Sequence, residues 1–167
     1  MNTRKIVLTG LLLAICIAFQ MLKSLSVYIT GPAVNAILLL ATLYVGLPSG
    51  IFIAICAPLI AYLVGATPII NLLPIMLPII MVGNALITIP VHFLKERNLP
   101  LGMVIGSVLK ALFLFVFVCL LVLPGAAIPE KVATAAKGTF SITQLITAAI
   151  GSVIAYIIYK RLPNNMQ

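Results

Sequence analysis

The fold is decided by residues 33–66, which read AVNAILLLATLYVGLPSGIFIAICAPLIAYLVGA, 34 consecutive positions without a charged side chain. As a single helix this stretch would be about 51 Å long, whereas the hydrocarbon core of a bilayer is about 30 Å thick. The stretch must therefore fold back on itself. The segment at 46–50, Gly-Leu-Pro-Ser-Gly, predicts the turn between two short helices.

The chain as a whole has the composition of an integral membrane protein. Hydrophobic residues make up 63% of its 167 residues and charged residues only 7%, whereas soluble domains carry about 25% charged residues. Since each spanning helix needs roughly 20 residues, up to about six spans fit. We therefore expect an all-α integral membrane protein, a compact bundle of six transmembrane helices that forms one membrane domain over residues 1–167.

Charged residues and helix breakers predict where the spans begin and end. The six expected spans cover residues 5–22, 33–46, 49–66, 70–94, 99–123 and 139–159. Gly31-Pro32 is the expected breaker in a loop at 23–32. A longer loop is expected at 125–138, with room for a short surface helix.

The distribution of Lys and Arg predicts the orientation of the chain. With the N-terminus inside, six basic residues lie on the cytoplasmic side: Arg4, Lys5, Lys95, Arg97, Lys160 and Arg161. Lys23, Lys131 and Lys137 lie outside. Because cytoplasmic loops carry the excess of positive charge, this distribution predicts a multi-pass protein of the cell membrane with both termini cytoplasmic.

Several classes of function are disfavoured by what the sequence lacks. It has no P-loop to bind ATP. It has no Asp, and its two Glu, Glu96 and Glu130, lie in expected loops, so an intramembrane proton relay of carboxylates is missing. With His92 as the one histidine and three cysteines scattered in apolar runs, we expect neither a metal site nor an enzyme. The net charge of +8 is spread over helix ends, which disfavours nucleic-acid binding.

Lys110 is the main candidate for a functional residue. A cation at bilayer depth is costly and usually faces a cavity or the protein interior. Gly102, Gly106 and Lys110 recur every four residues and share one helix face, which points the lysine inward. Two interpretations stay open: Lys110 snorkels or pairs with a backbone carbonyl, or it contacts a ligand cavity. In the second case the anion comes from outside the chain.

Five further polar residues are candidate ligand contacts, each with a structural alternative. Gln144 lies in the outer third of the last span and could instead join two helices. Asn35 follows the expected breaker and could cap a helix. Asn71 lies beside prolines that free backbone carbonyls or kink the helix, and Asn84, which is deeper, favours an interhelical hydrogen bond. Tyr28 is an interface anchor or part of a lid. Apart from Asn84, these candidates lie in the outer half, as in a binder that captures a solute from outside.

Small residues recur on the first span. Gly10, Ala14 and Ala18 are spaced by four and line one helix face. Small residues let two membrane helices approach closely. This face packs either within the protein or against a separate membrane partner.

Four short motifs extend along nearly the whole chain: Ala-Ile-Cys-Ile-Ala at 14–18, Gly-Pro-Ala-Val-Asn at 31–35, Pro-Ile-Ile-Met-Val-Gly-Asn at 78–84 and Ser-Ile-Thr-Gln-Leu-Ile at 141–146. In this order, and with six spans, the chain resembles the substrate-binding S components of energy-coupling factor (ECF) transporters, a bacterial and archaeal vitamin-uptake system. The first motif is similar to the family's Ala-x-x-x-Ala docking motif. The ligand motifs of the thiamine, riboflavin and biotin members have no match here.

The resemblance implies a subunit that binds a vitamin or related micronutrient near the extracellular side of a prokaryotic membrane. It implies three partner subunits: a transmembrane coupling subunit, which Ala14 and Ala18 would meet, and two cytoplasmic ATPases. Those partners would hydrolyse ATP, so this chain would need no cofactor. Lys110 favours an anionic, carboxylate-bearing ligand, since dry surroundings strengthen the attraction. The alternatives are an autonomous small-solute carrier and a structural membrane subunit.

Overall fold

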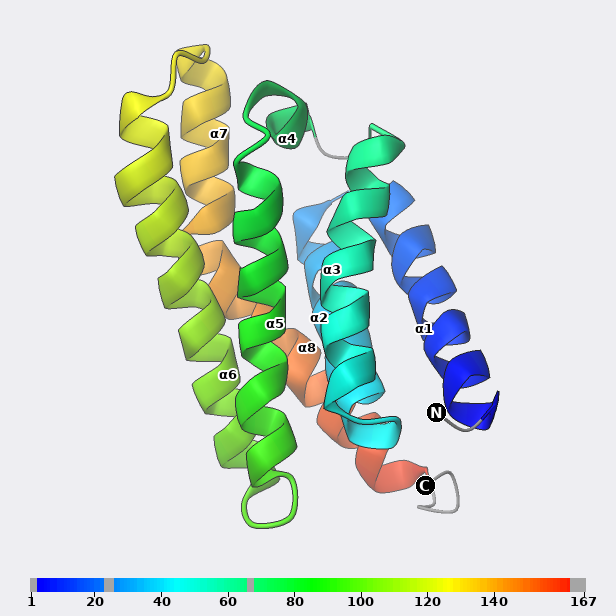
Figure 1. The fold of residues 1–167 in the computed structure, drawn as a ribbon. Coiled ribbons are helices and arrows are strands. Elements are labelled where there is room, and N and C mark those ends of the chain that lie inside the picture. The colour runs from blue at the N-terminus through cyan, green and yellow to red at the C-terminus, as the bar shows by residue number, and fades with distance from the viewer. Residues whose placement is uncertain (1–2, 23–25, 66–67, 163–167) are drawn as a thin grey trace.

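The computed structural model describes residues 3–22, 26–65 and 68–162 (Figure 1). Helices account for 88% of these residues, and none of them forms a strand, which confirms the prediction of an all-α chain. In order, the elements are α1 (Thr3–Met21), α2 (Val27–Tyr44), α3 (Leu47–Leu63), α4 (Pro68–Leu72), α5 (Met76–Leu94), α6 (Leu99–Leu114), the π-helix η2 (Phe115–Val122), the 3₁₀-helix η3 (Leu123–Gly125), α7 (Glu130–Phe140) and α8 (Ile142–Arg161).

Among the described residues, five helical segments are long and apolar enough to cross a membrane: Thr3–Met21, Val27–Tyr44, Met76–Leu94, Leu99–Gly125 and Glu130–Arg161. The helix α3 is apolar but has only 17 residues, about 25 Å at the usual rise of a helix. The sixth span and the orientation of the termini therefore stay predictions.

The charge-free stretch folds back where the glycine-proline turn was expected. Gly46 adopts φ +125°, which favours glycine. Pro48 follows in the first turn of α3, where the missing N–H has no intrahelical partner to lose. Gly50 then lies against Thr42 of α2, so that any added Cβ would collide with the threonine hydroxyl. The turn is shorter than predicted, because α3 already begins at Leu47.

The loop predicted at 23–32 is wrong for its second half, and the rest lies partly outside the described residues. The hydroxyl of Ser26 accepts a hydrogen bond from the amide of Tyr28 at 3.1 Å and caps a helix that begins at Val27. Gly31 and Pro32 therefore lie inside α2. The proline removes one backbone hydrogen bond there, but it does not end the helix.

Two other predicted spans also differ in the structure. The span at 70–94 is broken between Leu72 and Met76, around Pro74, which leaves α4 as a short separate helix. Most of the loop predicted at 125–138 is helix α7, and the last span begins at Ile142, after Ser141. The space left for a short surface helix is thus filled by α7, which leads directly into α8.

The helices pack closely where glycines allow it. A Cβ on Gly106 of α6 would lie 2.6 Å from the carbonyl oxygen of Ile87 on α5. On α8, a Cβ on Gly151 would lie 2.7 Å from the carbonyl oxygen of Pro32 on α2. The helix α2 is the most buried of the five candidate spans, and α1 is the least.

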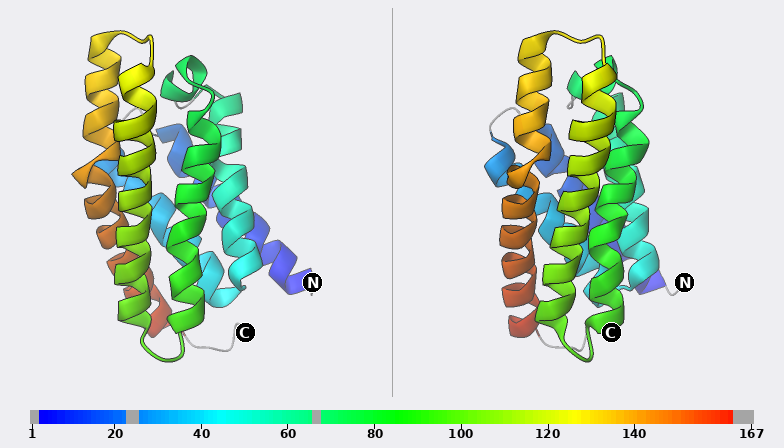
Figure 2. Two further views of the ribbon diagram at one scale, coloured as in Figure 1. Left: turned by 60° about the vertical axis from the view of Figure 1, so that its left-hand side comes forward. Right: turned by 90° about the vertical axis from the view of Figure 1, so that its left-hand side faces the viewer.

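The two ends of the bundle differ. The start of α1, the end of α8 and the loop between α5 and α6 lie at one end, whereas α4 and the start of α7 lie at the other (Figures 1 and 2). Figure 2 shows α7 beside the last turns of the α6–η2–η3 segment, at the end away from the start of α1. We call this second end the distal end.

Candidate functional site

A cavity of about 700 Å³ lies toward the distal end, between the last turn of α1, the first turns of α2 and the helix α7. Its volume is in the range of about 300–1,000 Å³ that is usual for small-molecule sites. Polar side chains on six helices line it: Gln20, Thr30, Asn35, Asn84, Lys110, Lys131, Thr139 and Gln144. The chain's two carboxylates, Glu96 and Glu130, are not among the lining residues.

Lys110 is held by two asparagines. Its Nζ donates to Oδ1 of Asn35 at 2.5 Å and to Oδ1 of Asn84 at 2.7 Å. All three side chains are buried, with 4% of Lys110 exposed. Because an ammonium only donates hydrogen bonds, both amides must turn their oxygens toward it and their NH₂ groups away from it. We call these three residues the lysine–asparagine cluster.

Glycines on neighbouring helices make this cluster possible. Gly83 precedes Asn84 and has no room for a side chain, because a Cβ there would lie 2.8 Å from Leu114. A Cβ on Gly151 would lie 2.6 Å from the Cβ of Asn35. These close approaches hold α5 against α6 and α2 against α8 beside the cluster.

Lys110 was expected either to snorkel or pair with a backbone carbonyl, or to contact a ligand cavity. It lines the cavity and bonds to side-chain amides. Asn84 makes an interhelical hydrogen bond, as expected, although its partner is the lysine. Asn35 lies inside α2 and does not cap it, so the capping alternative is wrong.

Gln144 also lines the cavity, and it has a structural role as well. Its Nε2 donates to the carbonyl oxygen of Thr139 at 3.1 Å. This bond bridges the junction between α7 and α8. Gln144 therefore holds the junction in place and also lines the cavity.

Tyr28 and Asn71 are the two candidates that the structure does not bring to the cavity. Tyr28 is 58% exposed on the first turn of α2. Asn71 is exposed on α4. Neither lines the cavity, and a role for them in ligand binding stays a prediction.

Sequence reasoning missed four polar residues of the lining: Gln20, Thr30, Lys131 and Thr139. Gln20 carried a usable signal, because a buried amide near the end of an apolar helix needs a partner. Lys131 and Thr139 could be recognised only after residues 130–140 were known to form the helix α7. Their spacing of eight residues then places them on one face.

The small residues of α1 point away from the bundle. Gly10, Ala14 and Ala18 are all exposed, and a Cβ on Gly10 would meet no atom within 4 Å. The face is thus open to lipid or to a membrane partner. Packing of this face within the protein, one of the two alternatives, is not what the structure has.

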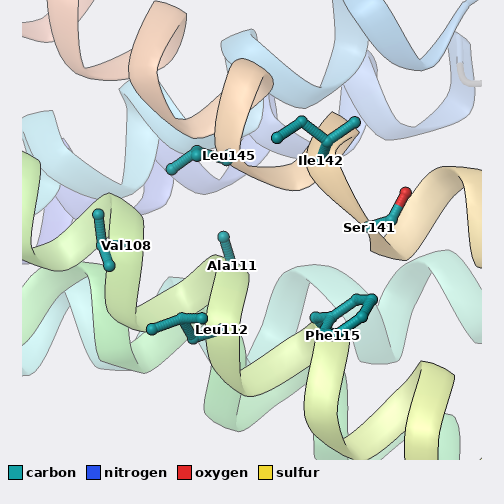
Figure 3. Close-up of a pocket in the computed structure, with 7 residues that line it drawn as sticks. All are labelled: Val108, Ala111, Leu112, Phe115, Ser141, Ile142 and Leu145. Carbon is teal, nitrogen blue, oxygen red and sulfur yellow. The ribbon is translucent and has the colours of Figure 1, made fainter.

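A second pocket, of about 440 Å³, differs in character from the cavity. It lies between the α6–η2 segment and the start of α8, and its labelled side chains are apolar except for Ser141 (Figure 3). The hydroxyl of Ser141 donates to the carbonyl oxygen of Gly138 at 3.1 Å, which satisfies it locally. This pocket suits a hydrocarbon chain rather than a polar solute.

The described residues contain no group of three or more His, Cys, Asp or Glu that could hold a metal ion. No family model, curated protein or solved structure matches this chain. The structure is thus an all-helical chain with several helices that are long and apolar enough for a multi-pass membrane protein, and its larger cavity has two lysines among an otherwise uncharged lining.

Proposed function

We propose that this chain is the substrate-binding S component of an ECF-type importer, which captures an anionic micronutrient from the extracellular side. The lysine–asparagine cluster carries the proposal. It presents a buried ammonium to a cavity of ligand size, and two neutral amides orient this ammonium.

The charges that line the cavity support an anionic ligand. Among the described residues, two lysines and no carboxylate line it, and attraction between opposite charges strengthens where water is scarce. The amide NH₂ groups of Asn35 and Asn84 are turned away from the ammonium. They can donate to a carboxylate bound beside it. A cationic ligand would meet repulsion from both lysines.

The position of the cavity supports capture from outside. It lies toward the distal end, away from the start of α1 and the end of α8. The excess of basic residues near the opposite end predicts that the distal end faces outward. A solute would thus enter from the extracellular side.

The source of energy and the partners follow from the same proposal. The chain has no P-loop and no intramembrane carboxylate relay, so uphill transport needs another subunit. The exposed face of Gly10, Ala14 and Ala18 offers a membrane partner a close approach of two backbones. A coupling subunit bound to two ATPases would supply energy from ATP hydrolysis.

Reconstitution tests the proposal against an autonomous carrier. Vesicles that contain this chain alone should bind solute without accumulating it. Vesicles that also contain the coupling subunit and the two ATPases should accumulate solute only when ATP is supplied on the cytoplasmic side. Uphill uptake by the chain alone would refute the proposal. Failure to assemble with any coupling subunit of the source organism would refute it equally.

A further inference from the structure

We infer that the ligand carries two acidic groups separated by an apolar body, one bound by the lysine–asparagine cluster and the other by Lys131. This inference rests on the proposed function and narrows its substrate class from anions to dianions. Lys131 is, with Lys110, one of the two lysines that line the cavity within the described ranges, and it lies in the first turn of α7.

One face of α7 forms a wall of the cavity along its length. The lining residues are Lys131, Val132, Ala135, Ala136, Thr139 and Phe140. This spacing is that of a single helix face. From Lys131 to Thr139 the wall is about 12 Å long. The cavity therefore extends far enough along α7 for a ligand with two separated ends.

The two lysines lie toward different ends of this wall. Lys131 belongs to the distal turn of α7 and is exposed. Lys110 is buried in α6, one turn before Leu114, which also lines the cavity. Apolar side chains share the lining: Val34, Ile80, Leu114 and Phe140. A ligand with two charged ends and an apolar body would match this combination of two lysines and apolar side chains.

The dipole of the helix α7 does not favour a lysine at position 131. The positive end of the helix dipole lies at its N-terminus, so a cation in the first turn is unfavourable. Glu130 precedes Lys131, but neighbouring residues of a helix do not face each other. Lys137, in the last turn, is placed as the dipole favours, and it does not line the cavity. A ligand contact requires a side chain that lines the cavity, and Lys131 meets this requirement whereas Lys137 does not.

The expected contribution of Lys131 is modest because the side chain is exposed. Exposed ion pairs change affinity by up to about fivefold. They are also screened by salt, since the Debye length is only about 3 Å at 1 M ionic strength. The contact of the ligand with the buried cluster should be less sensitive to salt.

The experiment compares monocarboxylates with linear dicarboxylates of matched length, from succinate to sebacate. Their binding to the purified full chain in lipid nanodiscs is measured by NMR titration at low and high salt. For the wild type, the best dicarboxylate should bind about three- to fivefold more tightly than its matched monocarboxylate at low salt. High salt and Lys131→Gln should each abolish this advantage. The control variant Lys137→Gln should keep it.

The possible failures are distinguishable. Equal affinity for both classes in the wild type, or a full dicarboxylate advantage in Lys131→Gln, would overturn the two-anchor inference. The proposed function would then still stand on assembly with the coupling module. Binding of neither class by the wild type would overturn this inference and the anionic site together.

Discussion

The ammonium of Lys110 donates to the side-chain oxygen of Asn35 at 2.5 Å, across 75 positions of sequence. This contact links α6 to α2, the most buried of the candidate spans. Asn84 completes the arrangement from α5. One cation thus contacts side chains from two other helices at the wall of the cavity, so the same side chain takes part in helix contacts and in the proposed ligand binding.

Replacement of Lys110 should separate these two roles. In Lys110→Met, the affinity for a monocarboxylate should fall at least tenfold, about 1.4 kcal/mol. The melting temperature should change little, because loss of a buried charge is offset by two amide oxygens left without their donor. NMR titration and thermal unfolding measure the two effects. The control Lys137→Met, in the last turn of α7 and not among the lining residues, should alter neither. Unchanged affinity in Lys110→Met would remove the lysine from the site.

A carboxylate placed inside the cluster should compete with the ligand. Asn84→Asp has nearly the same shape as the native residue, but it puts a fixed anion beside Lys110 at the position of an oxygen 2.7 Å away. We expect at least a tenfold weaker affinity for a monocarboxylate, because the ammonium already has a counter-ion. The folded protein should be at least as stable as the wild type in thermal unfolding.

Asn84→Leu is the matched control for that substitution. It removes the amide without adding a charge, so the ammonium should keep its attraction for an anion while the melting temperature falls. Stronger monocarboxylate binding by Asn84→Asp than by Asn84→Leu would contradict an anion site at the cluster.

The close packing of α5 and α6 should be intolerant of a single methyl group. Gly106→Ala would place a Cβ 2.6 Å from the carbonyl oxygen of Ile87, and a backbone atom cannot give way as a flexible side chain can. Overpacking of this kind costs about 1–3 kcal/mol. Thermal unfolding in a fixed detergent should report a clear loss of stability.

Gly138→Ala serves as the comparison, because a Cβ there would meet no atom within 4 Å. In the helix α7 this change should be neutral or stabilising by up to about 1 kcal/mol. Equal melting temperatures for the two alanine variants would contradict a tight contact between Gly106 and the carbonyl oxygen of Ile87.

Two features of the fold could be predicted from short stretches of sequence: the turn after α2 and the inward direction of Lys110. The turn near Gly46 follows from chain length and bilayer thickness, and the inward direction of Lys110 follows from the spacing of Gly102 and Gly106. The start of α2 was predicted wrongly because Gly31-Pro32 was taken as a breaker. The nearby cap residue Ser26 in fact sets the start of the helix.

The site was predictable only in part, since it depends on which helices meet. Lys110, Asn35, Asn84 and Gln144 were expected, and all four line the cavity. Lys131 was assigned to an outer loop, because residues 125–138 are polar enough for a surface segment. Its place in the cavity depends on how α7 packs beside η2 and α8, and no spacing rule specifies that packing.

The exposed small-residue face of α1 should be where a coupling subunit binds. Ala14→Trp and Ala18→Trp add a large ring at positions that are exposed, so the isolated chain should fold and bind a monocarboxylate as the wild type does. Assembly should be lost, because two backbones could no longer approach closely. Co-purification with the coupling subunit and the ATPases measures this directly.

Val153→Trp is the control for bulk on a lipid-facing surface, because Val153 is 58% exposed on α8. It should leave assembly intact. If the complex formed normally with tryptophan at both 14 and 18, the face would be a lipid contact and the coupling subunit would bind elsewhere. If all three variants lost assembly, added bulk alone would explain the loss, and the face of α1 would have no special role. Loss confined to positions 14 and 18 would identify close backbone approach as the physical basis of docking.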